Sequence, residues 1–115
     1  MEEGFSEAHI EFVFTDDADI LNINRQFLKH NYFTDVITFD YTEESRISGE
    51  IYISIDSVRK NAVLFSVSIS AEFRRVMVHG ILHLCGYGDS TDEEIVRMRE
   101  KEEHYLKEYS DEFHI

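Results

Sequence analysis

Alternating apolar and polar residues in three stretches of the chain predict β-strands. The first stretch is His9–Asp16, whose alternate positions carry Ile10, Phe12 and Phe14. This pattern is typical of a strand that buries one face. Two further runs of β-branched and aromatic residues, Asp35–Tyr41 and Glu50–Asp56, are separated by a polar segment. They predict an antiparallel pair of strands joined by a surface loop.

Helical spacing of apolar residues predicts one helix after the first strand and another after the third. Asp16 or Asp17 can serve as the N-cap of the first helix, because a short carboxylate accepts hydrogen bonds from free backbone N–H groups. The positions of this helix that share one face are Ile20, Leu21, Asn24, Phe27 and Leu28. The second helix is expected over Ser57–Phe65, with Asp56 or Ser57 as its N-cap.

Two longer helices are predicted in the second half of the chain. One runs from Ala71 to about Cys85 with Ser70 at its start, and it is apolar on nearly all sides, which predicts burial. Gly86 is placed to end it in a left-handed conformation. Thr91 and Glu94 then form a capping box that begins the last helix. The expected buried stripe of that helix is Ile95, Met98, Tyr105 and Tyr109.

These elements predict an α+β fold, close to the α/β class, in which helices pack on one small mixed sheet. A chain of 115 residues with 43% hydrophobic residues can form one domain, 1–115, and is too short for two. Its lone cysteine, Cys85, excludes an internal disulfide framework and suits a reducing cytoplasm. No apolar run reaches the roughly 18 residues of a membrane span, and the N-terminus does not resemble a signal peptide. We therefore expect a cytoplasmic protein without membrane contact.

The charge of the chain limits how it could bind nucleic acid. Eleven basic residues against 24 acidic ones give a net charge of −13, which argues against a broad basic footprint. From Asp89 onward ten acidic residues stand against four basic ones, so much of the excess lies in the C-terminal segment. The run Ala71–Gly88 holds Arg74 and Arg75 against Glu72 alone. A local cationic site is compatible with this distribution.

The stretch VHGILHLCGYGDST carries the spacing of a metal site. His79 and His83 are four positions apart, so on a helix they lie on one face, roughly 40° apart. A third ligand requires the chain to turn back, which Gly86 permits, and Asp89 follows. The offsets match the zincin-like pattern H-x-x-x-H-x-x-G-x-x-H with a carboxylate as the last ligand. Three protein ligands plus water is the catalytic zinc pattern, and the carboxylate also suits other divalent ions. The alternative is two buried histidines that hydrogen-bond beside a plain helix stop.

The residue after His79 separates two chemistries. A zinc protease of this type uses glutamate there as its general base, and this chain has Gly80. A protease is therefore the less favoured interpretation. RNA, in contrast, supplies its own 2′-hydroxyl nucleophile and depends less on a protein base.

The same residues carry a resemblance to a known family. The run HGILHLCGYGD resembles the signature H-G-x-L-H-L-x-G-Y-D-H of the YbeY family of bacterial rRNA maturation factors and metal-dependent endoribonucleases. The downstream E-x-x-x-M-x-x-x-E is matched by Glu94, Met98 and Glu102. Upstream, TDVITF and SGEIYIS are similar to T-D-V-L-S-F and L-G-D-I-x-I-S. The likeness runs from about Leu21 to Leu106, with the motifs in the same order.

The resemblance implies a cytoplasmic endoribonuclease specific for single-stranded RNA, with one Zn²⁺ per chain. It implies a role in 16S rRNA 3′-end maturation and ribosome biogenesis, with the small ribosomal subunit or its proteins as partners. It places Asp89 at the third ligand position, where the family usually has histidine, and Thr34 and Asp35 beside the metal cleft. Leu28 stands where many members have an arginine.

A nuclease also needs a cation near the scissile phosphate. Arg75 lies one turn before His79 on roughly the same face, and Lys29 neighbours the position of the family arginine. Both are candidates for phosphate contact, and solvated charge or pairing with carboxylates is the alternative for each. Asp35 could instead only cap its strand. Glu102 interrupts the apolar stripe of the last helix, and we expect it to be structural, hydrogen-bonded to the metal-site loop.

Three functions are therefore compared. The favoured one is a metal-dependent endoribonuclease of ribosome maturation. The second is a metallohydrolase with another substrate, including a degenerate metalloprotease. The third is a non-catalytic ribosome-assembly factor with a structural metal, for which the acidic charge is the best argument.

Overall fold

The sheet is built around one central strand. The structure, a computed structural model, describes residues 7–27 and 36–108. Strand β3 pairs in parallel with β1 on one side and antiparallel with β2 on the other, giving the order β1-β3-β2. The small mixed sheet and the antiparallel pair are confirmed. In chain order the elements are β1 (Glu7–Thr15), α1 (Asp17–Phe27), β2 (Val36–Asp40), β3 (Arg46–Ser54), α2 (Ile55–Leu64), α3 (Ile69–Leu84) and α4 (Asp92–Glu108).

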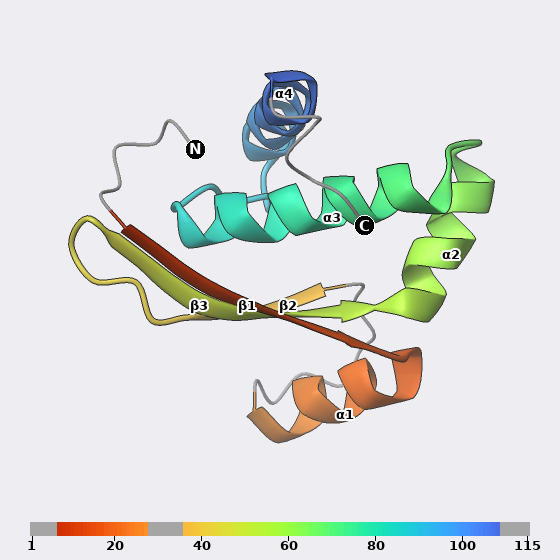
Figure 1. The fold of residues 1–115 in the computed structure, drawn as a ribbon, viewed down its shortest axis with the longest axis horizontal. Helices are drawn as coiled ribbons and strands as arrows, with labels where there is room; N and C mark the ends of the chain where they lie inside the picture. The colour runs from red at the N-terminus through yellow and green to blue at the C-terminus, as the bar shows by residue number, and fades with distance from the viewer. Residues whose placement is uncertain (1–6, 28–35, 109–115) are drawn as a thin grey trace.

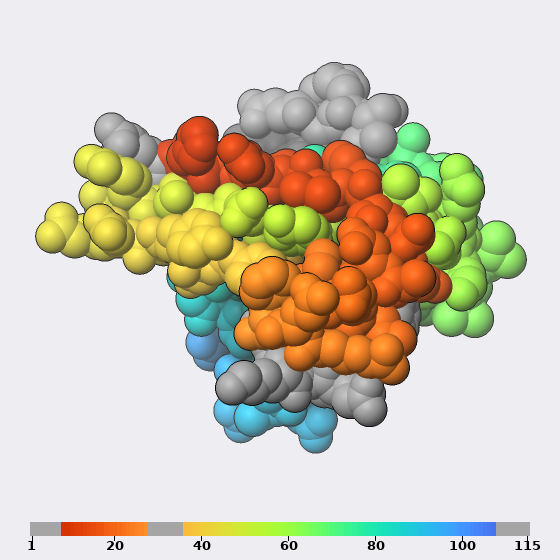
Figure 2. All heavy atoms as spheres, turned by 90° about the horizontal axis from the view of Figure 1, so that it is seen from below, coloured from red at the N-terminus to blue at the C-terminus, as the bar shows by residue number. Residues whose placement is uncertain are grey.

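The helices cover the two faces of the sheet unequally. Helix α3 runs across one face, α1 packs on the opposite face, and α4 lies on the far side of α3 (Figure 1). Seen from below, α1 covers only part of its face, and the strands extend past it (Figure 2). Helix α3 is therefore enclosed between the sheet and α4. The predicted α+β fold with a buried central helix is confirmed.

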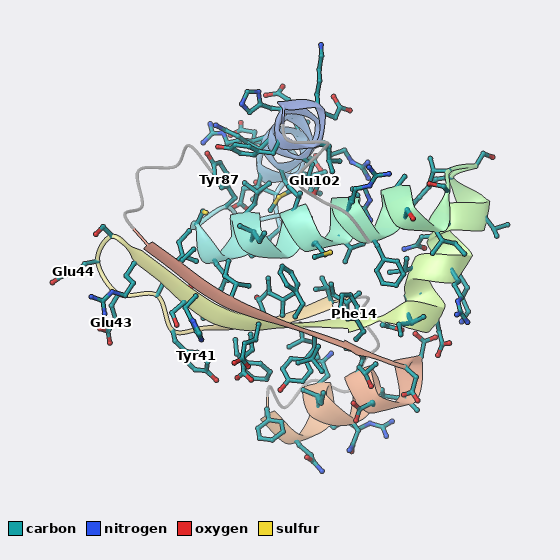
Figure 3. The ribbon with its side chains drawn as sticks, viewed as in Figure 1. Phe14, Tyr41, Glu43, Glu44, Tyr87 and Glu102 are labelled. Atoms are coloured by element: carbon teal, nitrogen blue, oxygen red, sulfur yellow. The ribbon has the colours of Figure 1, made fainter. Side chains whose placement is uncertain are left out.

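The main core lies between the sheet and α3. Alternate residues of β1 face it as predicted, since Ile10 and Phe12 pack against its buried cluster and the Phe14 ring meets Phe73 edge-on at 5.5 Å (Figure 3). The buried members of the cluster are Ile47, Ile51, Ile53, Val58, Val76, Ile81 and Leu84. Among the described residues, no helix is both long and apolar enough to cross a membrane.

Several predicted element boundaries are wrong by two to four residues. Helix α2 begins after Ser54 and not at Asp56 or Ser57, because the Ser54 hydroxyl accepts the Ser57 N–H at 3.2 Å. Helix α3 begins after Ser68 and not at Ser70, because the Ser68 hydroxyl accepts the Ala71 N–H at 3.0 Å. Strand β3 begins at Arg46, so the loop before it is shorter than expected. In both helices the N-cap is thus a serine that precedes the predicted one in the sequence.

The N-terminal caps predicted for α1 and α4 are confirmed. Asp16 caps α1 by accepting the Asp19 N–H at 2.8 Å. Thr91 and Glu94 form the capping box, with reciprocal hydrogen bonds of 3.0 and 3.1 Å. Met98 and Tyr105 are buried in a second cluster between α3 and α4, whereas Ile95 is 40% exposed and does not belong to the buried stripe as predicted. Tyr109 lies outside the described residues.

Gly80 is where α3 comes closest to the sheet. It is buried, and a Cβ atom built on it would lie 2.8 Å from Cγ2 and 3.0 Å from Cδ1 of Ile51 in β3. Real Cβ atoms essentially never approach a neighbour at 2.8 Å, so a side chain at this position requires either α3 or the Ile51 side chain to shift. Residue 80 therefore sets how closely the histidine-bearing helix sits on the sheet.

We expect Gly80→Ala to destabilise the protein by about 1–3 kcal/mol through overpacking. The sign is diagnostic, because the same change at an exposed helix position stabilises by about 1 kcal/mol. Equilibrium urea denaturation measures the difference. The cost should shrink in an Ile51→Ala background, where the facing side chain is gone. A Gly80→Ala protein more stable than the wild type would contradict the close approach.

Candidate metal centre

Helix α3 places two imidazoles one turn apart. The Nε2 atoms of His79 and His83 lie 3.0 Å from each other, and both side chains are half-buried on the side of α3 that faces α4. Burial of the opposite side of α3 against the sheet holds this face in position. The predicted histidine pair on one helical face is confirmed.

A tight turn after α3 returns the chain to the histidines. Gly86 has a φ of +104°, its N–H donates to the His83 carbonyl at 3.0 Å, and the Tyr87 N–H donates to the Leu82 carbonyl at 3.0 Å. This is a Schellman C-cap, which requires the left-handed conformation that glycine adopts without strain. Asp89 follows directly, and its Oδ2 lies 3.3 Å from His79 Nε2 and 3.4 Å from His83 Nε2.

The three atoms have the separations of ligands on one small ion. His79, His83 and Asp89 each offer one atom to a common group that could hold a metal. Ligands about 2.0–2.1 Å from a tetrahedral zinc ion are spaced by roughly 3.3 Å. The observed separations of 3.0, 3.3 and 3.4 Å bracket that value. Within the described part of the chain no fourth protein ligand joins the group, so the set has the three-ligand form of catalytic sites.

The outer nitrogens of both histidines are held by acceptors. His83 Nδ1 lies 2.9 Å from the carbonyl oxygen of Tyr87, and His79 Nδ1 lies 2.6 Å from Oε2 of Glu102. A carbonyl or a carboxylate only accepts, so both Nδ1 atoms must carry the proton and donate. Figure 3 shows Tyr87 and Glu102 on the α4 side of α3. An imidazole with its single proton on Nδ1 therefore presents the lone pair of Nε2 toward Asp89.

This arrangement needs a cation. Two nitrogen lone pairs at 3.0 Å and a carboxylate oxygen at 3.3–3.4 Å from them repel one another. The alternative from the sequence, a hydrogen bond between the two histidines, requires an extra proton that makes one of them cationic. A divalent metal ion satisfies all three acceptors at once.

Glu102 lies at one end of a buried chain of charges. Arg75 donates to both carboxylate oxygens of Glu72 at 2.9 and 2.7 Å, and to Glu102 Oε1 at 3.4 Å. The carboxylates of Glu72 and Glu102 are only 2% and 5% exposed. The hydrogen bonds to Glu72, with the charges of Glu72 and Glu102, raise the pKa of the Arg75 guanidinium above its ordinary value despite its partial burial.

Two sequence predictions change at this point. For Arg75 the sequence left phosphate contact and carboxylate pairing open, and the structure has the pairing. Glu102 is expected from the sequence to bond the metal-site loop, and it instead bonds His79 itself. The available signal is a carboxylate on an otherwise apolar helix face. Lys29, Thr34 and Asp35 lie outside the described residues, so their predicted roles stay predictions.

Comparison with known proteins identifies the family. The family model described as Endoribonuclease YbeY matches residues 1–110. The chain belongs to the YbeY family. A relative from Flavobacterium psychrophilum named Endoribonuclease YbeY is 49% identical over 107 residues, which are 93% of this chain and 76% of the relative. One of the same name from Parabacteroides distasonis is 47% identical over 103 residues, 90% of this chain and 72% of that protein.

A solved structure agrees with the YbeY assignment. The solution structure of TM1509 from Thermotoga maritima superimposes with a TM-score of 0.60 at 30% sequence identity. The match covers 91% of this chain and 73% of that protein. The resemblance seen in the motifs is thereby confirmed at the level of both sequence and fold.

The contact between Glu102 and His79 makes a prediction for metal affinity. We expect Glu102→Gln to weaken zinc binding by about 10- to 100-fold, because partners that orient a histidine ligand typically contribute that much. Competition with a chromophoric chelator measures the affinity. Glu103→Gln is the matched control, since Glu103 is exposed on the same helix and carries the same charge. Equal affinities for the two variants would contradict the orienting role.

The position of Asp89 makes a second prediction. Asp89→His should keep or raise zinc affinity, because imidazole is a good zinc ligand and the turn at Gly86 fixes where the side chain starts. Asp89→Ala should lower it by about 100-fold or more, since a ligand is lost. The same competition assay applies. Wild-type zinc affinity in Asp89→Ala would show that position 89 is not a ligand.

Proposed function

We propose that this chain is a zinc-dependent endoribonuclease that cleaves single-stranded RNA. The observation that carries the proposal is the convergence of two Nε2 lone pairs and one carboxylate within 3.4 Å of one another. A divalent ion would satisfy all three atoms of such a set, and its three-ligand form leaves room for water or substrate. The relatives' name, Endoribonuclease YbeY, supplies the reaction class.

His79, His83 and Asp89 would hold the ion. When bound, a zinc ion acts as a Lewis acid that polarises a phosphoryl oxygen and lowers the pKa of a coordinated water. Glu102 keeps the proton of His79 on Nδ1, and the Tyr87 carbonyl does the same for His83. Both Nε2 atoms thus stay available as ligands without rearrangement, which preorganises the site.

Packing at Gly80 argues against the protease alternative. A zinc protease would carry its general base at this position. Here the position faces Ile51 in the core, so a glutamate side chain would start toward the sheet and not toward the histidines. A phosphodiester of RNA brings its own nucleophile and needs no base from residue 80.

The biological setting we propose follows from the family. The chain would act in the cytoplasm on rRNA, in 16S 3′-end maturation, with the small ribosomal subunit or its proteins as partners. A chain of net charge −13 is a poor general RNA binder, which favours a substrate presented by such a partner.

The test is cleavage of a labelled single-stranded RNA by the zinc-loaded protein. We expect wild type to cut it, and His83→Ala or chelator treatment to reduce the rate by at least about 100-fold, because electrostatic stabilisation by the ion is lost. Added zinc should restore the chelated wild type. His9→Ala is the matched control, since His9 is exposed on β1, far from α3 in the sequence.

Two outcomes would oppose the proposal. Stoichiometric zinc in the wild type with equal cleavage by wild type and His83→Ala would remove the nuclease function and leave the metal site. Failure to retain any divalent ion after incubation with zinc would remove the site itself.

A further inference from the structure

A cavity of about 250 Å³ adjoins the candidate metal centre. Its lining includes His79, Asp89 and Glu102, together with two arginines, Arg75 and Arg99. Two of the three candidate ligands, His79 and Asp89, thus line this space, so a phosphodiester brought to them could extend into it. The two guanidiniums are therefore the cations of the cavity wall that could meet it.

Arg75 and Arg99 differ in their surroundings. Arg75 is held by Glu72 and Glu102, whose two buried carboxylates outweigh its single charge. Arg99 is exposed on α4 and, among the residues that the structure describes, forms no hydrogen bond or ion pair. Glu102 and Glu103 stand three and four positions further along the helix, the spacing at which helical ion pairs form, yet neither pairs with it. No residue in the described ranges 7–27 and 36–108 thus takes up the donors of Arg99.

We propose that Arg99 binds a phosphate group of the RNA substrate beside the metal centre. The inference rests on the proposed function, because it names the residue that holds the substrate of that same site. A guanidinium matches the geometry of two phosphate oxygens and bonds them in parallel, which an ammonium group does not. Of the two guanidiniums in the cavity wall, that of Arg75 is bonded to Glu72, whereas that of Arg99 has no partner among the described residues and can form such a pair of bonds.

The electrostatics of the cavity favour such a residue. Asp89, Glu102 and Glu72 contribute three carboxylates, and Arg75 compensates one of them. A divalent ion at the ligands would only balance the two remaining negative charges, so an RNA phosphate meets no net positive charge at this wall unless a further cation faces it. Arg99 is in place to be that cation.

The experiment compares Arg99→Gln, Arg99→Lys and Arg97→Gln with wild type, all loaded with zinc. Arg97 is the matched control, since it is exposed on the same helix, carries the same charge and lines separate cavities with Tyr87 and Val96. Two quantities are measured on one single-stranded RNA: kcat/KM for cleavage and the dependence of RNA affinity on salt. Zinc content is determined for every variant.

We expect Arg99→Gln to lower kcat/KM about tenfold, mainly through KM, because the interaction holds substrate and transition state alike. The slope of log affinity against log salt should shrink by about 0.7, the value expected when one phosphate of a single strand is no longer neutralised. Arg99→Lys should recover part of the loss, and Arg97→Gln should match the wild type.

The outcomes separate this inference from the proposed function. Cleavage and a salt slope that are unchanged in Arg99→Gln would overturn the role of Arg99 while the nuclease stands. A reduced salt slope in a protein whose wild type binds RNA without cutting it would remove the nuclease and support the role of Arg99. Equal losses in Arg99→Gln and Arg97→Gln, or a loss of zinc from Arg99→Gln, would overturn that role. Absence of RNA binding by the wild type would overturn both.

Discussion

The hydrogen bond between Glu102 and His79 is the contact on which the candidate site depends. It joins α4 to α3 at 2.6 Å, and the carboxylate that accepts it is almost fully buried. A buried carboxylate is costly unless it is paired, and Arg75 and His79 together provide that pairing. The apolar contact of Val78 and Leu82 with Met98 and Tyr105 brings the two helices together. The hydrogen bond then decides which nitrogen of His79 is free.

Local pattern was enough to predict the elements and the grouping of the candidate ligands. The strands, the enclosed helix, the capping box and the turn at Gly86 all depend on residues close together in the sequence. The group His79, His83 and Asp89 spans only ten positions, and helix geometry followed by one turn nearly determines its arrangement. The N-cap residues were harder to predict, because each helix has two chemically equivalent serines near its start. These are Ser54 and Ser57 for α2, and Ser68 and Ser70 for α3. Which serine caps depends on where the preceding strand or turn ends.

The partners of the charged side chains could not be predicted from local pattern. Arg75 and Glu102 are 27 positions apart, so their pairing follows from the packing of α4 on α3 and from no local spacing. Arg75 and Arg99 are both arginines on helices near the histidines, and the sequence offers no means to tell a neutralised guanidinium from a free one. Each has a glutamate three positions away on its own helix, and in the structure Arg75 pairs with Glu72 and Glu102 whereas Arg99 pairs with no described residue. The roles of side chains at the site thus needed the tertiary structure, whereas the ligand set did not.

The contact between Gly80 and Ile51 has an evolutionary consequence. The histidine helix of this fold meets the sheet at a position where zinc peptidases of similar spacing carry their general base. A glutamate substituted at position 80 would lie against strand β3. It would disrupt the packing of the core there and would not be placed to transfer a proton at the metal site. Conversion to peptide hydrolysis would therefore require a change in the packing of α3 against Ile51 as well as a new base at position 80. The close approach of α3 to β3 at Gly80 therefore makes an evolutionary change from RNA cleavage to peptide hydrolysis at this site more difficult.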